Sequence, residues 1–317
     1  MPHSSRKRVI LTGASGVVGR HLVDAVLRRG WEVSVLTVSG ANVLPSGVRK
    51  IKWDPKAAAG GDSKALDTIA RALDGTDWLV NLAGETLGSG RLDGKHKKRV
   101  MQSRLDAGNA LHSARLACPN PPMVWTQASA TGFYGDTGEA DVYETAPAGK
   151  HFFLADVCKA WEGAATQALD APKAPRVIVA RLGLVLAKDA PAWEKMLLPI
   201  KIGAGGPLGS GKQWYAWIDA DEAAEAMIFL FEKSDASGVY NFTTPEPIRQ
   251  IDMTKQTAEA IGRPSYFPAP AFALRLAVGG VADALLLPSC RALPDRLAKA
   301  GYPFKTTDFE DELPKLV

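Results

Sequence analysis

The sequence predicts the α/β class, with a doubly wound parallel sheet and a smaller C-terminal lobe. Two observations support this class. The first half of the chain alternates compact apolar runs with longer amphipathic segments, as expected for a parallel sheet wrapped by helices. In addition, three glycines at three-residue spacing follow the first apolar run directly. At 317 residues, the chain is long enough for one large domain with a dependent lobe.

Six apolar runs are predicted strands. They occupy residues 8–12, 33–37, 48–53, 78–83, 123–128 and 177–182. The helix that joins the first two strands carries Val18, Leu22 and Val26 on one face, and Gly30 follows its end. A longer helix over residues 94–117 crosses from the fourth strand to the fifth, because parallel neighbours need such a crossover.

The glycines Gly13, Gly16 and Gly19 lie between the first strand and its helix. Gly13 permits a tight turn, Gly16 lets the backbone approach a pyrophosphate, and Gly19 allows the helix to pack closely on the sheet. Amide groups at the positive end of the helix dipole then hold the anion. The strand, turn and helix together predict a dinucleotide-binding unit.

The end of the second strand bears on the choice of cofactor. An NAD enzyme places an acid there, on the ribose 2′-hydroxyl, whereas this segment reads Thr37-Val38-Ser39 and Glu32 precedes the strand. Without that acid there is room for a 2′-phosphate, to which Thr37 and Ser39 can donate, so NADP is favoured and NAD is the alternative. Asp54 either binds the adenine amino group or provides turn chemistry with the proline that follows.

The second half is less regular. Five glycines within residues 203–211 predict a loop, and Trp214 and Trp217 beyond it predict either a flap over a sugar or nucleobase or plain packing between lobes. A helix near 221–231 and a strand at 239–242 are expected to return to the main sheet. The predicted NAD(P)-binding domain is residues 1–190 with the returning segment 213–244, and the predicted substrate or lid lobe is 191–212 and 245–317.

Composition excludes several classes of protein. A hydrophobic content of 46% and a charged content of 23% are those of an ordinary globular chain, and a net charge of +4 predicts no nucleic-acid partner. Three widely spaced cysteines without a CxxC pair predict no metal site and a reducing, cytoplasmic location. The apolar stretch 272–287 contains Arg275 and Asp283 and is shorter than the ~20 residues of a membrane span, so we predict no membrane segment.

Three motifs appear in order: Thr12-Gly-x-x-Gly-x-x-Gly19, Asn81-Leu-Ala-Gly84 and Ser129-Ala-Thr-Gly-Phe-Tyr-Gly135. They resemble the extended short-chain dehydrogenase/reductase superfamily. The glycine-proline loop 205–211, with Gln213-Trp214, is similar to the nucleoside-diphosphate-sugar epimerase-like subgroup, also called NAD-dependent epimerase/dehydratase. The resemblance runs from Val9 to near Phe304. It implies a Rossmann-type domain, a nicotinamide dinucleotide and a substrate cleft between the lobes.

The chain departs from the superfamily at its catalytic pair. In the superfamily a tyrosine with a lysine four residues later transfers the proton, but none of the six tyrosines here has a lysine at that spacing. Matching Glu162 to the acid that follows the pair places the two positions on Leu154 and Cys158. Leucine transfers no proton, and we expect Cys158 to be a buried structural thiol.

The remaining candidates for catalysis are hydroxyl groups near the expected nicotinamide, namely Ser129, Thr131 and Tyr134. They either polarise a substrate carbonyl or cap backbone groups of their own loop. Without a lysine, Tyr134 would keep a pKa near ~10 and be a weak base at neutral pH.

Two arginines are further candidates. Arg104 is expected to face the cofactor from the long helix, and Arg181, near the end of an apolar strand, needs a carboxylate or phosphate partner if it is buried. The residues predicted to contact the cofactor are Gly13, Ala14, Ser15, Gly16, Val17, Val18, Gly19, Thr37, Ser39, Asp54, Leu82, Ala83, Gly84, Glu85, Arg104 and Arg181.

Two functions follow from these observations. The first is an NADP(H)-binding, epimerase-like oxidoreductase that acts on a small carbonyl, hydroxyl or nucleotide-sugar substrate, with the cofactor supplying the hydride chemistry. The second is a dinucleotide-binding sensor or regulatory protein that has lost catalysis together with the Tyr-x-x-x-Lys pair. The expected partner is a small molecule in both cases, and the oligomeric state is left open.

Overall fold

Seven parallel strands form the central sheet of the protein. The structure is a computed structural model that describes residues 6–38 and 43–317. The strands of the sheet are β1 (Arg8–Thr12), β2 (Glu32–Thr37), β3 (Arg49–Lys52), β4 (Trp78–Asn81), β5 (Val124–Ala130), β7 (Arg176–Leu182) and β11 (Gly238–Phe242). Their order is β11-β7-β5-β4-β1-β2-β3, and each neighbouring pair is parallel. The predicted doubly wound sheet is therefore confirmed.

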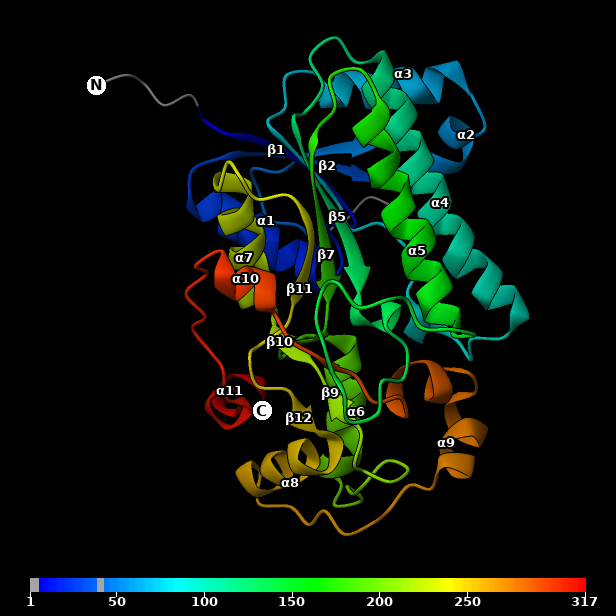
Figure 1. The fold of residues 1–317 in the computed structure, drawn as a ribbon, viewed down its shortest axis with the longest axis vertical. Helices are drawn as coiled ribbons and strands as arrows, with labels where there is room; N and C mark the ends of the chain where they lie inside the picture. Colours follow the sequence, from blue (N-terminus) through cyan, green and yellow to red (C-terminus); the bar gives the residue numbers. More distant parts are fainter. Residues whose placement is uncertain (1–5, 39–42) are drawn as a thin grey trace.

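Helices cover both faces of this sheet (Figure 1). On one face lie α1 (Val17–Arg28) and α7 (Ala220–Glu232), and on the other lie α3 (Ser63–Leu73), α4 (Gly94–Ala117) and α5 (Phe153–Thr166). The short helix α2 (Pro55–Ala59) packs against α4. The predicted bounds of the long helix 94–117 agree with α4, and the helix predicted near 221–231 is α7.

The central strands are rich in apolar residues because both of their faces are buried. Successive side chains of a strand point to opposite faces, so Val9 and Leu11 pack under α1 and α7, while Ile10 packs under α3 and α4. All three side chains are essentially inaccessible to solvent. The same alternation places Trp78 in the first core cluster, stacked on Phe231 of α7 with 4.6 Å between ring centroids, and its neighbour Leu79 in the second.

The strand predicted at 239–242 does return to the main sheet, where β11 pairs with β7. The segment just before α7 does not. Its strand β9 (Trp214–Tyr215) pairs with β12 (Ile248–Arg249), and β10 (Trp217–Asp219) pairs with β8 (Leu184–Leu186), each forming a separate two-stranded sheet. Only α7 and β11 of the returning segment 213–244 therefore belong to the central layers.

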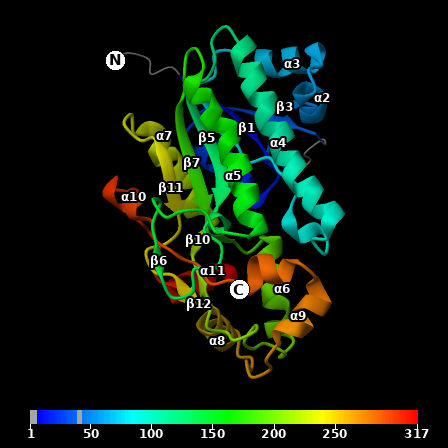
Figure 2. The same ribbon diagram turned by 45° about the vertical axis from the view of Figure 1, so that its right-hand side comes forward.

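A second group of helices lies beyond the carboxyl ends of the parallel strands (Figures 1 and 2). It consists of α6 (Pro191–Lys201), α8 (Gln250–Ala260), α9 (Ala271–Val278), the π-helical turn η4 (Ala282–Leu286) and α11 (Phe309–Leu316). In contrast, α10 (Asp295–Lys299) packs on β11, and Leu297 and Tyr302 join the core beneath the sheet. The C-terminal segment thus contacts both parts of the molecule.

The remaining elements are short connections: η1 (Leu87–Ser89), η2 (Thr131–Phe133), β6 (Asp141–Val142), η3 (Gln167–Asp170) and β13 (Arg291–Ala292). The apolar stretch 272–287 forms most of α9 and η4, separated by Gly279 at φ +63°. Among the helices of residues 6–38 and 43–317, we find none that is both long and apolar enough to cross a membrane.

Candidate functional site

The turn between β1 and α1 is built by three glycines that have different neighbours. Gly13 has φ +69°, and a Cβ there would lie 2.5 Å from the backbone oxygen of Leu82. A Cβ on Gly19 would lie 2.5 Å from the oxygen of Gly13. The nearest atom to a Cβ on Gly16 is the Gly13 oxygen at 3.3 Å, so Gly16 has more room around it. Gly13 and Gly19 are required by the fold, whereas the space at Gly16 is left for something outside the chain.

Helix α1 starts at this turn without a side-chain cap. Gly16 has no side chain to accept the first amide groups, and the first turn of α1 holds no acidic residue. The amide groups of that turn are therefore open to an anion, with the positive end of the helix dipole behind them. These features fit the pyrophosphate of a dinucleotide.

A cavity of about 390 Å³ lies next to the glycine turn, at the carboxyl ends of β1, β2 and β4. Its lining consists of Gly13, Ala14, Ser15, Val35, Leu36, Thr37, Val38, Trp53, Pro55, Ala83, Gly84, Glu85, Ser103, Asp106 and Ala107. In doubly wound sheets, the crevice beyond the point where the strand order reverses is the usual ligand site, and here that point lies between β1 and β4. The mostly apolar walls with a few polar groups suit an adenosine moiety.

The structure brings most of the predicted cofactor residues to this edge of the sheet. Seven line the cavity, namely Gly13, Ala14, Ser15, Thr37, Ala83, Gly84 and Glu85. Gly16, Val17, Val18 and Gly19 form the adjoining start of α1, and Leu82 backs the turn at Gly13. Ser39 lies outside the described residues. Asp54 caps α2, where its carboxylate accepts from the Ala57 amide at 2.9 Å, as the turn-chemistry alternative requires.

Eight lining residues of the cavity are absent from the predicted cofactor residues: Val35, Leu36, Val38, Trp53, Pro55, Ser103, Asp106 and Ala107. Trp53 follows β3 directly, and Ser103 and Asp106 lie one helical turn apart on α4. The spacing of Ser103, Asp106 and Ala107 (i, i+3, i+4) is the signal that could have found the α4 face, because residues at those positions share one side of a helix. A second cavity, of about 340 Å³, includes Arg8 and Glu32 at the opposite, amino ends of the strands, away from the glycine turn.

Arg104 is buried at the boundary between α4 and the loop after β4. Its Nη1 donates to the backbone oxygens of Glu85 at 3.0 Å and Val100 at 2.9 Å. The guanidinium lies over the ring of Trp161, 4.4 Å from its centroid. Burial lowers the pKa of Arg104 to about 10, which still leaves it charged at neutral pH. The side chain of Arg104 turns to α5 and is not part of the cavity lining, so its contact with the cofactor stays a prediction.

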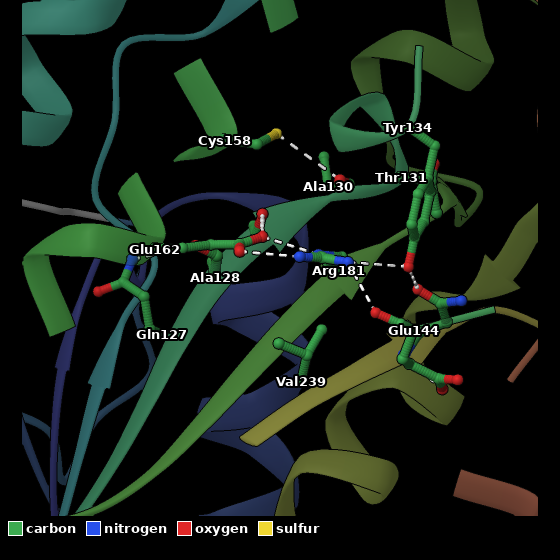
Figure 3. A network of polar contacts seen from close by, with 12 residues as sticks. Gln127, Ala128, Ala130, Thr131, Tyr134, Glu144, Cys158, Glu162, Arg181 and Val239 are labelled. Atoms are coloured by element: carbon green, nitrogen blue, oxygen red, sulfur yellow. Dashed lines mark hydrogen bonds and ion pairs between the residues drawn. The ribbon is translucent and has the colours of Figure 1, made fainter. Parts of the chain in front are cut away.

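The predicted catalytic hydroxyl of Ser129 belongs to a buried polar network. Figure 3 shows the part of this network that links Glu162, Arg181 and Tyr134. The Oγ of Ser129 donates to Oε1 of Glu162 at 2.6 Å, and Glu162 binds Arg181 through both oxygens, at 2.8 and 3.0 Å. Helix α5 supplies Glu162, while β5 and β7 supply the other two side chains. Arg181 thus has a carboxylate partner from its own chain. The carboxylate partner that the sequence analysis required is therefore present, and a contact between Arg181 and the cofactor stays a prediction.

Tyr134 lies at the other side of Arg181 in the same network (Figure 3). Its hydroxyl donates to Oδ1 of Asn241 at 2.6 Å and accepts from Nη1 of Arg181 at 3.0 Å. Burial raises the pKa of Tyr134 to about 12, above the ordinary value expected from the sequence. Tyr134 is therefore a structural link between η2 and β11 and is unsuited to act as a base at neutral pH.

Helix α5 packs on β5 and η2, where the superfamily carries its catalytic pair. Leu154 lies against Gly132, and a Cβ added at Gly132 would be 3.1 Å from the Cβ of Leu154. Cys158 donates from Sγ to the backbone oxygen of Ala130 at 3.6 Å, and burial raises its pKa to about 11. Neither position carries a group that exchanges protons near neutral pH. Cys158 is the buried structural thiol that the sequence suggested.

Thr131 differs from the other two candidate catalytic residues. Ser129 and Tyr134 are 1% and 4% exposed, whereas Thr131, in η2, is partly exposed. Its side-chain hydroxyl makes no hydrogen bond with residues 6–38 or 43–317, while its backbone oxygen accepts from the Tyr134 amide and from Sγ of Cys290. Thr131 is thus the one member of the three whose hydroxyl is left available at the carboxyl edge of the sheet.

The aromatic residues beyond the glycine loop pack between elements and do not form a flap. Trp217 is fully buried and meets Phe309 edge to face, with 5.5 Å between ring centroids. Trp214 lies between the guanidinium groups of Arg249 and Arg291, 4.2 and 4.7 Å from its ring centroid. The alternative interpretation, packing between lobes, therefore describes both tryptophans.

Together, the strand order, the glycine turn at the point of reversal and the adjoining cavity define a Rossmann-fold protein of the short-chain dehydrogenase/reductase class. Comparison with known proteins gives the family. The model of the NAD-dependent epimerase/dehydratase family matches residues 9–242, and the chain belongs to that family. Residues 269–314 match a separate domain of unknown function, DUF1731.

Similar proteins share the whole length of the chain. An epimerase family protein of Staphylococcus aureus (strain N315) is 32% identical over 98% of this chain and 99% of its own length. An epimerase family protein of Mycobacterium leprae (strain TN) is 34% identical over 96% of this chain and 94% of its own. Among solved structures, the human epimerase family protein SDR39U1 (isoform 2) with NADPH superposes with a TM-score of 0.84, at 28% identity over 98% of each chain. The predicted family and fold are confirmed.

Proposed function

We propose that this protein binds NADP(H) at the glycine turn and acts as an epimerase-like oxidoreductase on a small carbonyl, hydroxyl or nucleotide-sugar substrate. The observation that carries the proposal is the open backbone at Gly16, beside an uncapped helix start and the 390 Å³ cavity. A side chain at Gly16 would partly fill the space that a pyrophosphate needs, so the turn is shaped for a ligand outside the chain.

Two observations support NADP(H) as the cofactor. The wall that β2 and the residue after it contribute to the cavity is Val35, Leu36, Thr37 and Val38, which includes no carboxylate to bind a ribose 2′-hydroxyl. The human relative of similar fold was crystallised with NADPH. The family description names NAD, which keeps NAD as the alternative cofactor.

The cofactor would supply the hydride chemistry, and the chain would bind and orient the reactants. The residues to hold its pyrophosphate are those of the Gly13–Gly19 turn, and those to hold its adenosine are the walls of the cavity. We assign Thr131 to donate a hydrogen bond to the substrate oxygen, because its hydroxyl is the accessible one. Ser129 and Tyr134 hold the segment in place through Glu162 and Asn241.

The residues at two positions of α5 favour a second function, one without catalysis. Leu154 and Cys158 leave the usual site of proton transfer without a titrating group near neutral pH. A protein that binds the dinucleotide and reports its presence needs no such group. The alternative is therefore a dinucleotide-binding sensor or regulatory protein.

Turnover assays separate the two functions. Purified protein with NADPH or NADP⁺ is given a panel of aldehydes, ketones, alcohols and sugar nucleotides, and the absorbance of the reduced nicotinamide is followed. Redox turnover is seen directly, and chromatography of the products detects epimerisation, in which the cofactor is restored. Tight cofactor binding without turnover of any substrate would overturn the enzyme proposal and support the sensor.

The role of Thr131 is tested within any activity found. Thr131→Val removes the hydroxyl and keeps the shape, and we expect kcat to fall by about a hundredfold to a thousandfold, as for other lost donors near a reacting oxygen. Thr68→Val, on the exposed face of α3, is the matched control and should leave kcat unchanged. Equal rates for wild type and Thr131→Val would remove Thr131 from the proposal.

The cellular setting also stays a proposal. Cys118, Cys158 and Cys290 are free thiols, which agrees with a reducing compartment such as the cytoplasm. Among residues 6–38 and 43–317, no three His, Cys, Asp or Glu side chains cluster as metal ligands would. The partner we propose is the small-molecule substrate.

A further inference from the structure

Arg104 carries a buried charge without an ionic partner. The side chain is 7% exposed, yet no carboxylate of the described chain lies within 4.0 Å of its nitrogens. Its hydrogen bonds go to two backbone oxygens, both from Nη1. Nε is fully buried and makes none. The carboxylate of Glu85, which acts on the charge of Arg104 from a distance, is paired with Arg99 at 3.0 Å.

The third nitrogen, Nη2, is the one that can reach a ligand. It makes no hydrogen bond with residues 6–38 or 43–317, and it is absent from the fully buried polar atoms without a partner. The guanidinium also lies directly against Gly84, where a Cβ would approach Cζ to 2.7 Å. Gly84 lines the cofactor cavity, so Arg104 lies directly behind one of the cavity's wall residues, although it is not itself part of the lining.

The strand order places Arg104 on one side of the site. The adenosine cavity extends from the glycine turn over β2 and Trp53, and its wall on the β4 side is formed by Ala83–Glu85 together with Ser103, Asp106 and Ala107 of α4. A dinucleotide spans the reversal point, so its second nucleotide lies over β4 and β5. Arg104 contacts the loop that follows β4, and it stacks on Trp161 of α5, the helix that packs on β5. It therefore borders the second half of the dinucleotide site.

Burying a guanidinium away from water costs free energy unless hydrogen-bond acceptors or a counter-charge pair with it, and backbone oxygens compensate for only part of the charge. We propose that Arg104 binds the nicotinamide half of the cofactor, with Nη2 donating to a ribose or phosphate oxygen of the nicotinamide mononucleotide. Arg104 then strengthens the binding of the intact dinucleotide over that of its adenosine half alone, which the glycine turn and the cavity hold. This inference rests on the proposed function and adds a residue and a subsite to it.

Cofactor fragments provide the test. Calorimetry measures the dissociation constants of NADPH and of 2′,5′-ADP, which is the adenosine half alone, for wild type and for Arg104→Met. Methionine keeps the apolar stem against Trp161 and removes the charge. We expect at least about tenfold weaker NADPH binding and an unchanged constant for 2′,5′-ADP, with Arg104→Lys restoring part of the loss. Equal effects on both ligands, or none on either, would overturn the inference.

The matched control is Arg115→Met. Arg115 is a second buried arginine of α4, 2% exposed, and it binds the backbone oxygens of Pro122 and Lys173 at the far end of the helix. Its loss should leave the ratio of the two dissociation constants at the wild-type value. A rise in the dissociation constant of NADPH relative to that of 2′,5′-ADP for both variants would assign the effect to general weakening of α4 and overturn the inference.

A measurement on the wild type covers the case in which Arg104→Met does not fold. The ¹⁵N–¹H signal of Arg104 Nε, assigned with Arg104→Lys, should shift when NADPH is added and stay in place with 2′,5′-ADP. No shift with NADPH would contradict the inference even if the variant is insoluble. A wild type that binds neither ligand would instead overturn the proposed function and, with it, this inference; binding of both ligands with no role for Arg104 would overturn the inference alone.

Discussion

The ion pair between Arg181 and Glu162 joins β7 to α5, and its two side chains are only 5% and 12% exposed. Glu162→Gln would leave the guanidinium charge buried without a counter-charge. We expect the free energy of unfolding to fall by about 3–5 kcal/mol, measured by urea denaturation. The surface pair Asp67–Arg71 supplies the control, since Asp67→Asn should cost at most about 1 kcal/mol. Similar losses for the two variants would contradict the importance given to the buried pair.

Tyr134 links stability to alkaline pH. Its pKa is about 10 in the unfolded chain, the ordinary value, and about 12 in the folded protein because of burial. Below pH 10 the hydroxyl is neutral in both states and contributes no pH dependence. Between pH 10 and 12 only the unfolded chain loses the proton, so stability falls with pH, by up to about 1.4 kcal/mol per unit from this residue.

Urea midpoints at pH 8, 10 and 11 check this sign. Burial also raises the pKa of Tyr215, so the wild type should lose stability through more than one tyrosine. Tyr134→Phe should therefore show a shallower decline than the wild type, while Tyr266→Phe, at an 82% exposed position, should match it. Identical declines for Tyr134→Phe and the wild type would contradict the role of burial at Tyr134.

At the residue scale, the sequence predicted which chemical groups are present better than it predicted which side chains contact one another. The absence of a titrating pair was readable, because it depends only on which residues occupy positions 154 and 158. The partner of Arg181 was not, because Glu162 lies 19 residues away on another element. The bond between Tyr134 and Asn241 joins residues 107 positions apart, and only the pairing of β11 with β7 brings them together.

At the glycine turn, the effect of a mutation on cofactor binding can be separated from its effect on stability. Gly16 has φ −73°, which alanine adopts readily, and a Cβ there has only the Gly13 oxygen within 4 Å. We expect Gly16→Ala to change stability by less than about 1 kcal/mol, while NADPH binding weakens by at least about tenfold because the methyl group occupies the approach of the pyrophosphate. Thermal denaturation and calorimetry measure the two effects.

Gly163→Ala is the control for this experiment. Gly163 lies in the interior of α5, and a Cβ added there would meet nothing within 4 Å, so alanine should stabilise the helix by about 0.5–1 kcal/mol and leave NADPH binding unchanged. By contrast, Gly13→Ala should destabilise the fold itself. Gly13 has φ +69°, which alanine rarely adopts, and the added Cβ would lie 2.5 Å from the backbone oxygen of Leu82. Undiminished NADPH affinity in Gly16→Ala would contradict the site.

Elements with a regular hydrophobic period were predictable, and those shaped by contacts with the rest of the chain were not. The bounds of α4 and the positions of the parallel strands followed from local pattern, because strands buried on both faces are rich in apolar residues. The strands β9 and β10 were not separable from the returning segment, because each has only two or three residues and pairs with a distant strand. Trp214 and Trp217 look alike in the sequence, and their partners alone distinguish packing from a flap.

At the scale of the whole molecule, the site lies where the fold places it. The reversal of strand order between β1 and β4 opens a crevice at the carboxyl edge, and the second group of helices lies beyond that edge (Figure 2). The sequence predicted this arrangement through the glycine turn and the strand pattern. The domain bounds 1–190, 213–244, 191–212 and 245–317 stay a prediction, and residues 295–302 show why a linear division is difficult, since Leu297 packs in the main core.

The central claim, that the glycine turn binds NADP(H), is tested most directly by calorimetric titration of the wild-type protein with NADPH and, separately, with NADH. We predict saturable binding of one NADPH per chain, with NADH weaker, because the β2 wall of the cavity includes no acid for a free 2′-hydroxyl. Tighter binding of NADH would contradict the choice of cofactor. No binding of either nucleotide at millimolar concentration would contradict the claim itself.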